Sequence, residues 1–392
     1  MFTSRRVAFY GAIVCASYLA MLAAMTVLAD RPTRVDFMAF YEAGRLAIEG
    51  QAAKAYDWAQ VRPLQAALMG VDEREVETFL GWVNPPHFLF AVVPFSWMPF
   101  GWAWFLWAVA TALLMAIAIR SVFPEAATPA CILALCAPAV FTCASVGQNG
   151  LLTAALMAWT YALMDRRPVL AGVALGLLTY KPQFGLLPPL ILAATGRWRI
   201  FAAAAVTAMA AMAAALLTFG PATLLGFLDN VALNNDRYLA EANAVLPRIQ
   251  SVYALVLGIT ERTDIAWAIH LAFAAAVAAI VLRLWLRRPE GPEEARAAAA
   301  IAASFLMTPF TWVYDAPSLV VAGAFLWRAG MRQGYLAWER PLIVLACVST
   351  QVIAFTGPHS AIVPASWLVL LALAWRRDRA WRLSQGPSAT PS

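Results

Sequence analysis

The residues of this sequence that could do chemistry are few, and they flank or interrupt long apolar stretches. Asp36 follows the first stretch, Gln148 and Asn149 stand between two others, and Lys181 interrupts a further one. A carboxylate can accept a proton, and an ammonium group can bind an anion such as a lipid phosphate. Polar residues within apolar sequence are costly, so these positions indicate a functional site.

Structural roles are also open to the same residues. Asp36 could cap a helix expected at 37–49, and Gln148-Asn149 could serve only as a turn. Lys181 could extend its amine towards the membrane surface, or it could pair with Asp315. The residue types alone do not decide between these interpretations.

The elements that must position these residues are membrane helices. Of the 392 residues, 62% are hydrophobic and 13% are charged, whereas a soluble domain averages roughly 45–50% apolar and about 25% charged. Soluble, disordered and coiled-coil classes are therefore excluded. The net charge of +6 is then interpreted as a signal of membrane orientation and not of nucleic-acid binding. Five cysteines lack metal-site spacing and no Asp-x-Asp motif is present, so we expect no metal and no cofactor.

Apolar runs predict an all-α polytopic membrane protein with about ten spans, because a spanning helix needs about 20 apolar residues. The predicted spans are 7–29, 101–120, 129–146, 150–164, 200–219, 264–286, 297–312, 315–327, 341–356 and 361–375.

The apolar stretch 169–195 follows a different pattern, because the tetrapeptide at 180–183 divides it into halves too short to span. Arginines flank both ends, at 166, 167, 197 and 199. This predicts a re-entrant helical pair that enters and leaves on one side. With that pair, short segments on the N-terminal side hold 18 of the 28 basic residues, and short segments opposite hold three. The charge bias places both termini in the cytoplasm.

The domain organisation follows from this topology. We expect one membrane-embedded domain over 1–383, with outer loops at 30–100 and 220–263, and a disordered cytoplasmic tail at 384–392. The first outer loop is expected to contain helices near 37–49, 57–69 and 87–98.

The uncommon polar groups then gather on the outer membrane face, which predicts the site there. The candidate residues on that face are Asp36, Tyr41, Glu42, Gln148, Asn149, Lys181, Arg237, Tyr314, Asp315 and His359.

Four blocks in order carry a family resemblance. They are Val35–Arg45 (VDFMAFYEAGR) with Gly50 and Ala55-Tyr56-Asp57; Asn84-Pro85-Pro86 with Pro94 and Pro99; Gly147-Gln148-Asn149-Gly150 with Ala171-Gly172-Val173 and Lys181-Pro182-Gln183; and Thr308-Pro309 with Tyr314-Asp315. Over about 35–320 the chain resembles glycosyltransferase family 87, which includes bacterial membrane mannosyltransferases that use polyprenyl-phosphate sugars.

The resemblance implies a GT-C-type helical bundle whose catalytic acidic residue lies in the first outer loop. Asp36 would then be the general base. Donor and phosphate contacts would fall to Lys181, Arg237, Gln148 and Asn149. Substrate contacts would fall to Tyr41, Glu42, Tyr314, Asp315 and His359. Some relatives carry a histidine in the late motif, where this sequence has Tyr314-Asp315.

The expected reaction is an inverting transfer of a sugar, mannose by resemblance, from a polyprenyl-phosphate donor to a glycolipid or glycan acceptor. It would occur at the outer face of a bacterial cytoplasmic membrane. The partners are the donor, the acceptor and the lipid bilayer, with no nucleic acid. The alternative is a polytopic lipid or sugar transporter or flippase. Transporters often contain two halves with matching broken helices, whereas one broken segment is evident here, at 169–195.

Overall fold

The fold is helical throughout the part of the chain that the computed structural model describes, which comprises residues 4–29, 35–76, 80–240, 249–286, 292–349 and 362–385. Within these ranges the one pairing of β type is an isolated bridge between Ile249 and Trp312. The predicted all-α membrane fold is confirmed. Of the predicted tail, residues 386–392 lie outside the described ranges, and Ser384 still belongs to the last helix.

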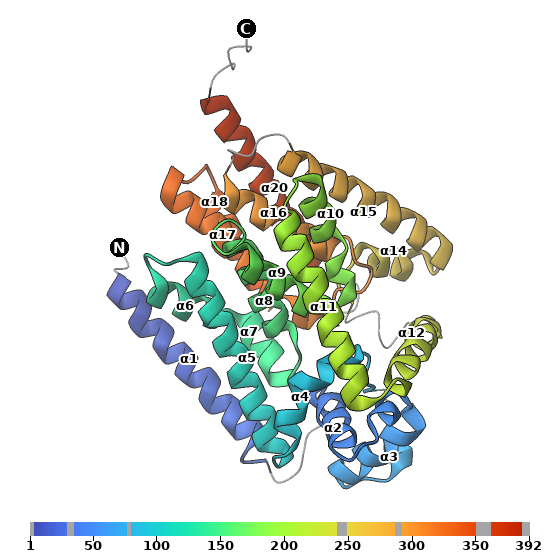
Figure 1. The fold of residues 1–392 in the computed structure, drawn as a ribbon. Coiled ribbons are helices and arrows are strands. Elements are labelled where there is room, and N and C mark those ends of the chain that lie inside the picture. The colour runs from blue at the N-terminus through green and yellow to red at the C-terminus, as the bar shows by residue number, and fades with distance from the viewer. Residues whose placement is uncertain are drawn as a thin grey trace.

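The helices follow one another along the chain (Figure 1). The α-helices are α1 Ser4–Thr26, α2 Phe37–Ile48, α3 Trp58–Met69, α4 Leu89–Ser96, α5 Phe100–Val122, α6 Ala127–Leu135, α7 Pro138–Val146, α8 Gly150–Ala162, α9 Pro168–Leu177, α10 Leu187–Ala194, α11 Trp198–Phe219, α12 Ala222–Ala240, α14 Val252–Thr260, α15 Thr263–Leu286, α16 Glu293–Leu306, α17 Pro317–Gln333, α18 Glu339–Val348 and α20 Ile362–Ser384. The 3₁₀ turns are η1 Ala52–Tyr56, η2 Glu73–Glu75, η3 Pro86–Phe88, η4 Leu178–Tyr180, η5 Pro182–Gly185 and η7 Val313–Asp315.

Four described helices, α1, α5, α11 and α15, are long and apolar enough to cross a membrane, and α6 with α7 forms a fifth candidate bent by 58°. The expectation of about ten full-length spans is therefore larger than the number of long apolar helices. Several of the other predicted spans are shorter helices enclosed by protein. All but the first residue of the 14-residue helix α16, for example, are buried. A helix surrounded by protein needs no lipid-length apolar surface, so such helices fall below the length expected of a lipid-facing span.

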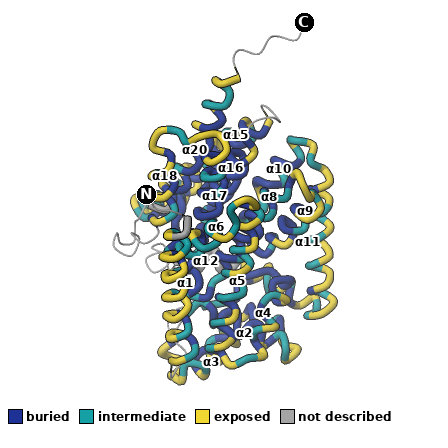
Figure 2. Tube along the Cα trace, turned by 90° about the vertical axis from the view of Figure 1, so that its left-hand side faces the viewer, coloured by how far each residue is buried: buried dark blue, intermediate teal, exposed yellow. Residues whose placement is uncertain are grey.

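Figure 2 shows the resulting division between inside and outside, with exposed residues along α1 and α11 and buried residues through α16 and α17. The outward side chains of α1 and α11 are largely apolar, as lipid-facing helices require.

The broken stretch 169–195 forms two short helices that double back. A Cβ added at Gly172 would meet the carbonyl oxygen of Ile200, and one added at Gly176 would meet the side chain of Thr207. The later residue of α9 contacts the later residue of α11. The two helices therefore run in the same direction. The intervening α10 must return between them. This is the arrangement predicted for a re-entrant pair.

The ends of that pair lie together, because Arg197, just before α11, forms an ion pair with Asp165, just before α9. Lys181 lies at the opposite end of the pair, between η4 and η5. The pair therefore carries its lysine into the interior of the bundle.

The first loop packs into the bundle through α2, whose residues are buried along most of their length. Rings from α2, the 80–88 segment and α5 form one aromatic cluster: Phe37, Phe40, Trp82, Phe88 and Trp107. Figure 1 places α2, α3 and α12 at one end of the molecule, away from the C-terminus. The helices predicted at 37–49, 57–69 and 87–98 correspond to α2, α3 and the η3–α4 segment.

Candidate functional site

Asp36 directly precedes α2, and its side chain points to the α7–α8 turn. Its carboxylate makes no capping hydrogen bond to α2. Instead, the side-chain amide of Gln148 donates to Asp36 Oδ2 at 3.1 Å. The capping interpretation is therefore disfavoured, and the carboxylate is held by a residue 112 positions away in sequence.

Two glycines allow the α7–α8 turn, which carries Gln148, to pack closely against its neighbours. Gly147 has φ +68°, and a Cβ there would lie 2.5 Å from the Cβ of Phe37. A Cβ at Gly150 would lie 1.8 Å from the carbonyl oxygen of Tyr314. Contacts this close exclude any larger residue without backbone movement. The α7–α8 turn therefore packs directly against Phe37, which follows Asp36, and against Tyr314, which precedes Asp315.

Asn149 extends the polar network away from Asp36. Its Nδ2 donates to Asn84 Oδ1 at 3.3 Å, and its carbonyl oxygen lies 3.1 and 3.2 Å from the hydroxyls of Thr153 and Tyr180. These hydroxyls are 2.7 Å apart, so one can donate to the other while the second donates to the carbonyl oxygen. Asn149 is 2% exposed, and its Oδ1 is buried without a partner among the described residues. A buried amide oxygen of this kind can accept a bond from a ligand.

Lys181 and Asp315 form the charged part of the site. Lys181 Nζ lies 2.5 Å from Asp315 Oδ1, and the side chains are 8% and 0% exposed. The backbone N–H of Trp312 donates to the other oxygen, Asp315 Oδ2, at 3.0 Å. The ammonium group also lies 5.3 Å from the centre of the Tyr314 ring, which stacks on Trp312. The pairing of Lys181 with Asp315, one of the alternatives open from the sequence, is the one observed.

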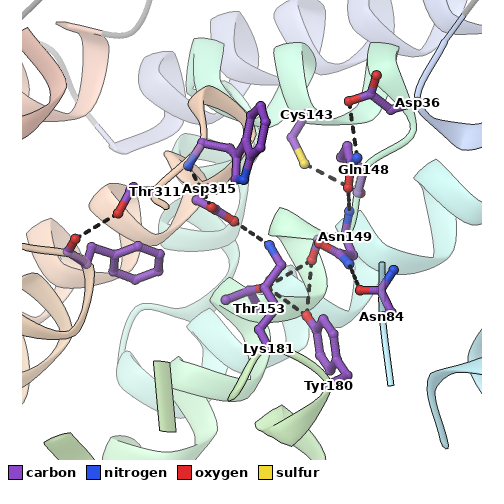
Figure 3. A network of polar contacts seen from close by, with 12 residues as sticks. Asp36, Asn84, Cys143, Gln148, Asn149, Thr153, Tyr180, Lys181, Thr311 and Asp315 are labelled. Atoms are coloured by element: carbon purple, nitrogen blue, oxygen red, sulfur yellow. Dashed lines mark hydrogen bonds and ion pairs between the residues drawn. The ribbon is translucent and has the colours of Figure 1, made fainter. Parts of the chain in front are cut away.

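Figure 3 shows Gln148 and Asn149 between Asp36 on one side and the Lys181–Asp315 pair on the other. Tyr180 joins the two parts, because its hydroxyl belongs to the Asn149 network and its neighbour is Lys181. The site therefore combines a half-buried carboxylate, a set of fixed amides and a buried ion pair.

Two further predicted residues, Tyr41 and Glu42, make no described hydrogen bond to this network. The Tyr41 hydroxyl donates to the Met98 carbonyl at 3.0 Å, and its ring packs on Phe100. Glu42 is 6% exposed, and no described hydrogen bond joins it to the network. Burial, opposed by Arg45, raises the pKa of Glu42 to about 7. Arg237 belongs to α12, but its side chain is not described, and His359 lies outside the described residues.

Three members of the network were not selected from the sequence: Asn84, Thr153 and Tyr180. The sequence feature that could have identified them is their closeness in the chain to the candidate residues. Asn84 begins the Asn-Pro-Pro block, Thr153 lies one helical turn after Asn149, and Tyr180 precedes Lys181. Within the described ranges, no three His, Cys, Asp or Glu residues are grouped to hold a metal ion.

Long apolar helices around an internal polar network define an integral-membrane protein with a site inside its helical bundle. The model of glycosyltransferase family 87 matches residues 82–310, more than half of the chain, and the chain belongs to this family. It is therefore a membrane glycosyltransferase. No curated protein and no solved structure matches it. The matched range contains Asn84, Gln148, Asn149 and Lys181, whereas Asp36 and Asp315 lie outside it.

Proposed function

We propose that this glycosyltransferase moves a hexose, mannose by family resemblance, from a polyprenyl-phosphate donor to a glycolipid or glycan acceptor. The observation that carries the proposal is the contact between Asp36 and Gln148. A half-buried carboxylate that does not cap its helix is held by a side-chain amide beside a buried ion pair.

Asp36 acts as the general base in this proposal. Figure 3 shows one carboxylate oxygen turned towards Gln148 and the other pointing away. In this proposal Gln148 fixes the orientation of the carboxylate, and the carboxylate takes the proton of the acceptor hydroxyl. General-base catalysis contributes typically about 10²–10⁴-fold to such a step.

The reaction is a single displacement. The acceptor oxygen attacks the anomeric carbon, its proton passes to Asp36, and the bond from the anomeric carbon to the phosphate oxygen breaks. Polyprenyl phosphate leaves with the bonding electrons, and the anomeric configuration inverts. The phosphate already leaves as a stable anion, so no second carboxylic acid is required to protonate it.

Lys181 stabilises the leaving phosphate. An ammonium group has three N–H donors, and the described contacts of Lys181 assign one to Asp315. Asp315 orients the amine, and the remaining donors meet the phosphate oxygens. Arg237 on α12 adds charge, while Asn149 Oδ1 accepts a bond from a sugar hydroxyl and Tyr314 lines the sugar site.

The basic residues support an orientation in which both termini are cytoplasmic and the site faces outwards. In the predicted topology, short segments on the N-terminal side hold 18 of the 28 basic residues. A polyprenyl-phosphate sugar keeps its tail in the bilayer and its sugar at the surface, so it reaches a site among these helices by lateral diffusion.

The test measures transfer from radiolabelled polyprenyl-phosphate mannose in proteoliposomes. Asp36→Asn should lower the rate by at least about 100-fold while leaving thermal unfolding unchanged. Asp264→Asn, which alters an exposed aspartate at the start of α15, is the matched control and should retain the rate. Full activity of Asp36→Asn would remove Asp36 from the base role. Movement of the donor across the bilayer without transfer would support the transporter alternative.

A further inference from the structure

A second polar feature lies outside the network, at the end of the molecule that holds α2, α3 and α12. It is a cleft of about 240 Å³ between η1 and α12, lined by Ala53, Tyr56, Asp57, Trp58, Asp229 and Asn230. Figure 1 shows α12 beside α2 and α3 at this end of the bundle. None of these residues takes part in the proposed proton or phosphate chemistry.

The walls of the cleft are fixed to each other. Asn230, which is buried, donates from Nδ2 to the carbonyl oxygen of Tyr56 at 2.9 Å. A Cβ added at Gly226 would lie 3.2 Å from the Tyr56 ring, so α12 packs tightly on η1. The ring of Phe227 lies edge-on to Tyr56 at 6.1 Å. A hydrogen bond and ring contacts thus hold η1 and α12 against each other.

The chemistry of the lining favours one class of ligand. Asp57 and Asp229 are exposed carboxylates, Trp58 is a half-buried indole and Asn230 supplies an amide. Carboxylates accept hydrogen bonds from hydroxyl groups, and an indole packs on the apolar face of a sugar ring. Two negative charges repel phosphate and carboxylate groups. The lining therefore suits an uncharged molecule that is rich in hydroxyls.

The cleft is joined to the polar network by hydrogen bonds. The Tyr56 hydroxyl donates to the Asn84 carbonyl oxygen at 2.9 Å, and Asn84 Oδ1 accepts from Asn149. Gln148 follows Asn149 and holds Asp36. A ligand in the cleft therefore contacts Tyr56, which is the first residue of this chain of hydrogen bonds.

We propose that the cleft between η1 and α12 binds an uncharged sugar of the acceptor, with Trp58 stacking on the ring and Asp57 and Asp229 accepting hydroxyl bonds. Its assignment to the acceptor rests on the proposed transferase function. The binding itself does not, because it requires neither the donor nor Asp36.

The first measurement is direct binding without donor. The full-length protein in nanodiscs is titrated with an uncharged mannose disaccharide and with mannose 6-phosphate, and binding is followed by ligand-observed NMR. The disaccharide should bind and the phosphate should not. Asp229→Asn and Trp58→Ala should each weaken disaccharide binding by about tenfold, and Trp58→Phe should weaken it less.

Two variants serve as matched controls. Glu49→Gln changes an exposed carboxylate of the first loop that pairs with Arg45 away from the cleft, and it should bind as the wild type does. Asp264→Asn, which alters an exposed aspartate at the start of α15, should also bind normally. Asp229→Asn alters an exposed helix surface, so it should fold even if Trp58→Ala does not.

The outcomes distinguish the two proposals. Equal disaccharide binding by wild type and Asp229→Asn, or tight binding of mannose 6-phosphate, would overturn the cleft assignment. Wild-type transfer with no detectable disaccharide binding would also overturn it and would leave the transferase proposal intact. Disaccharide binding that depends on Trp58 and Asp229, in a protein that transfers no sugar, would support the cleft and refute the transfer reaction.

Discussion

The buried ion pair between Lys181 and Asp315 allows a structural role to be separated from a catalytic one. Lys181→Met and Asp315→Asn each remove one charge, and the double variant removes both. Asparagine is the suitable replacement because its amide oxygen can still accept the Trp312 N–H bond that Asp315 Oδ2 receives at 3.0 Å. Methionine keeps the length of the lysine side chain.

The size of the effect follows from burial. The two side chains are 8% and 0% exposed, and stranding one member of such a pair costs about 3–5 kcal/mol. Asp315→Asn should fall at the lower end, because the ring of Tyr314 lies 5.3 Å from the ammonium and partly compensates. The double variant leaves no buried charge, so it should lose only about 1–2 kcal/mol. The two single losses together amount to at least about 6 kcal/mol, so the cycle should show a coupling of at least about 4 kcal/mol.

Unfolding of the purified variants, followed by circular dichroism in mixed detergent, measures stability, and transfer from radiolabelled donor measures activity. The double variant should regain most of its stability yet remain about 10²–10³-fold slow in kcat, because the phosphate still lacks its cation. Additive losses of stability would contradict the buried pair. Recovery of activity together with stability would refute the phosphate role of Lys181 and leave it a structural one.

Two further predictions concern the turn and the first loop. Gly150→Ala places a Cβ 1.8 Å from the Tyr314 carbonyl oxygen, so it should displace the late motif and lower transfer by at least about tenfold, whereas Gly185→Ala, where nothing lies within 4 Å, should not. Glu42 has its pKa raised to about 7 from an ordinary value of 4.5, so the fold favours its neutral form. That stabilisation is fully present below pH 4.5 and is lost as the pH rises through 7, which amounts to about 3 kcal/mol. Unfolding at pH 5 and pH 8 should show the loss in wild type and its removal in Glu42→Gln, and equal pH dependence in both would contradict the assignment.

The sequence predicts the class of fold and part of the site. Apolar run length identifies membrane helices, and the interruption at Lys181 predicts the doubled-back pair, because both signals are local. Asp36 and Gln148 can be selected as candidates because they are polar residues beside apolar stretches. Their direct contact is not predictable, because it joins residues 112 positions apart.

Other features of the site depend on side-chain direction, which residue spacing does not specify. Tyr41 shares the first motif with Asp36, yet its hydroxyl is bonded to the Met98 carbonyl. Trp82 belongs to the outer loop predicted at 30–100, yet it is 1% exposed within the aromatic cluster. The cleft between η1 and α12 joins two loops far apart in the chain, and no single segment contains its signal.

The position of Lys181 at the tip of a doubled-back pair also bears on how the protein is made. Asp315 lies 134 residues later in the chain, and at about 5–20 residues per second the ribosome needs roughly 7–27 seconds to reach it. Until then the lysine has no carboxylate partner, and neither half of the pair is long enough to span the bilayer. The ion pair can form only after Asp315 has been made, so assembly of the site depends on the late motif. We expect chains that stop before residue 315 to be the forms that membrane proteases remove.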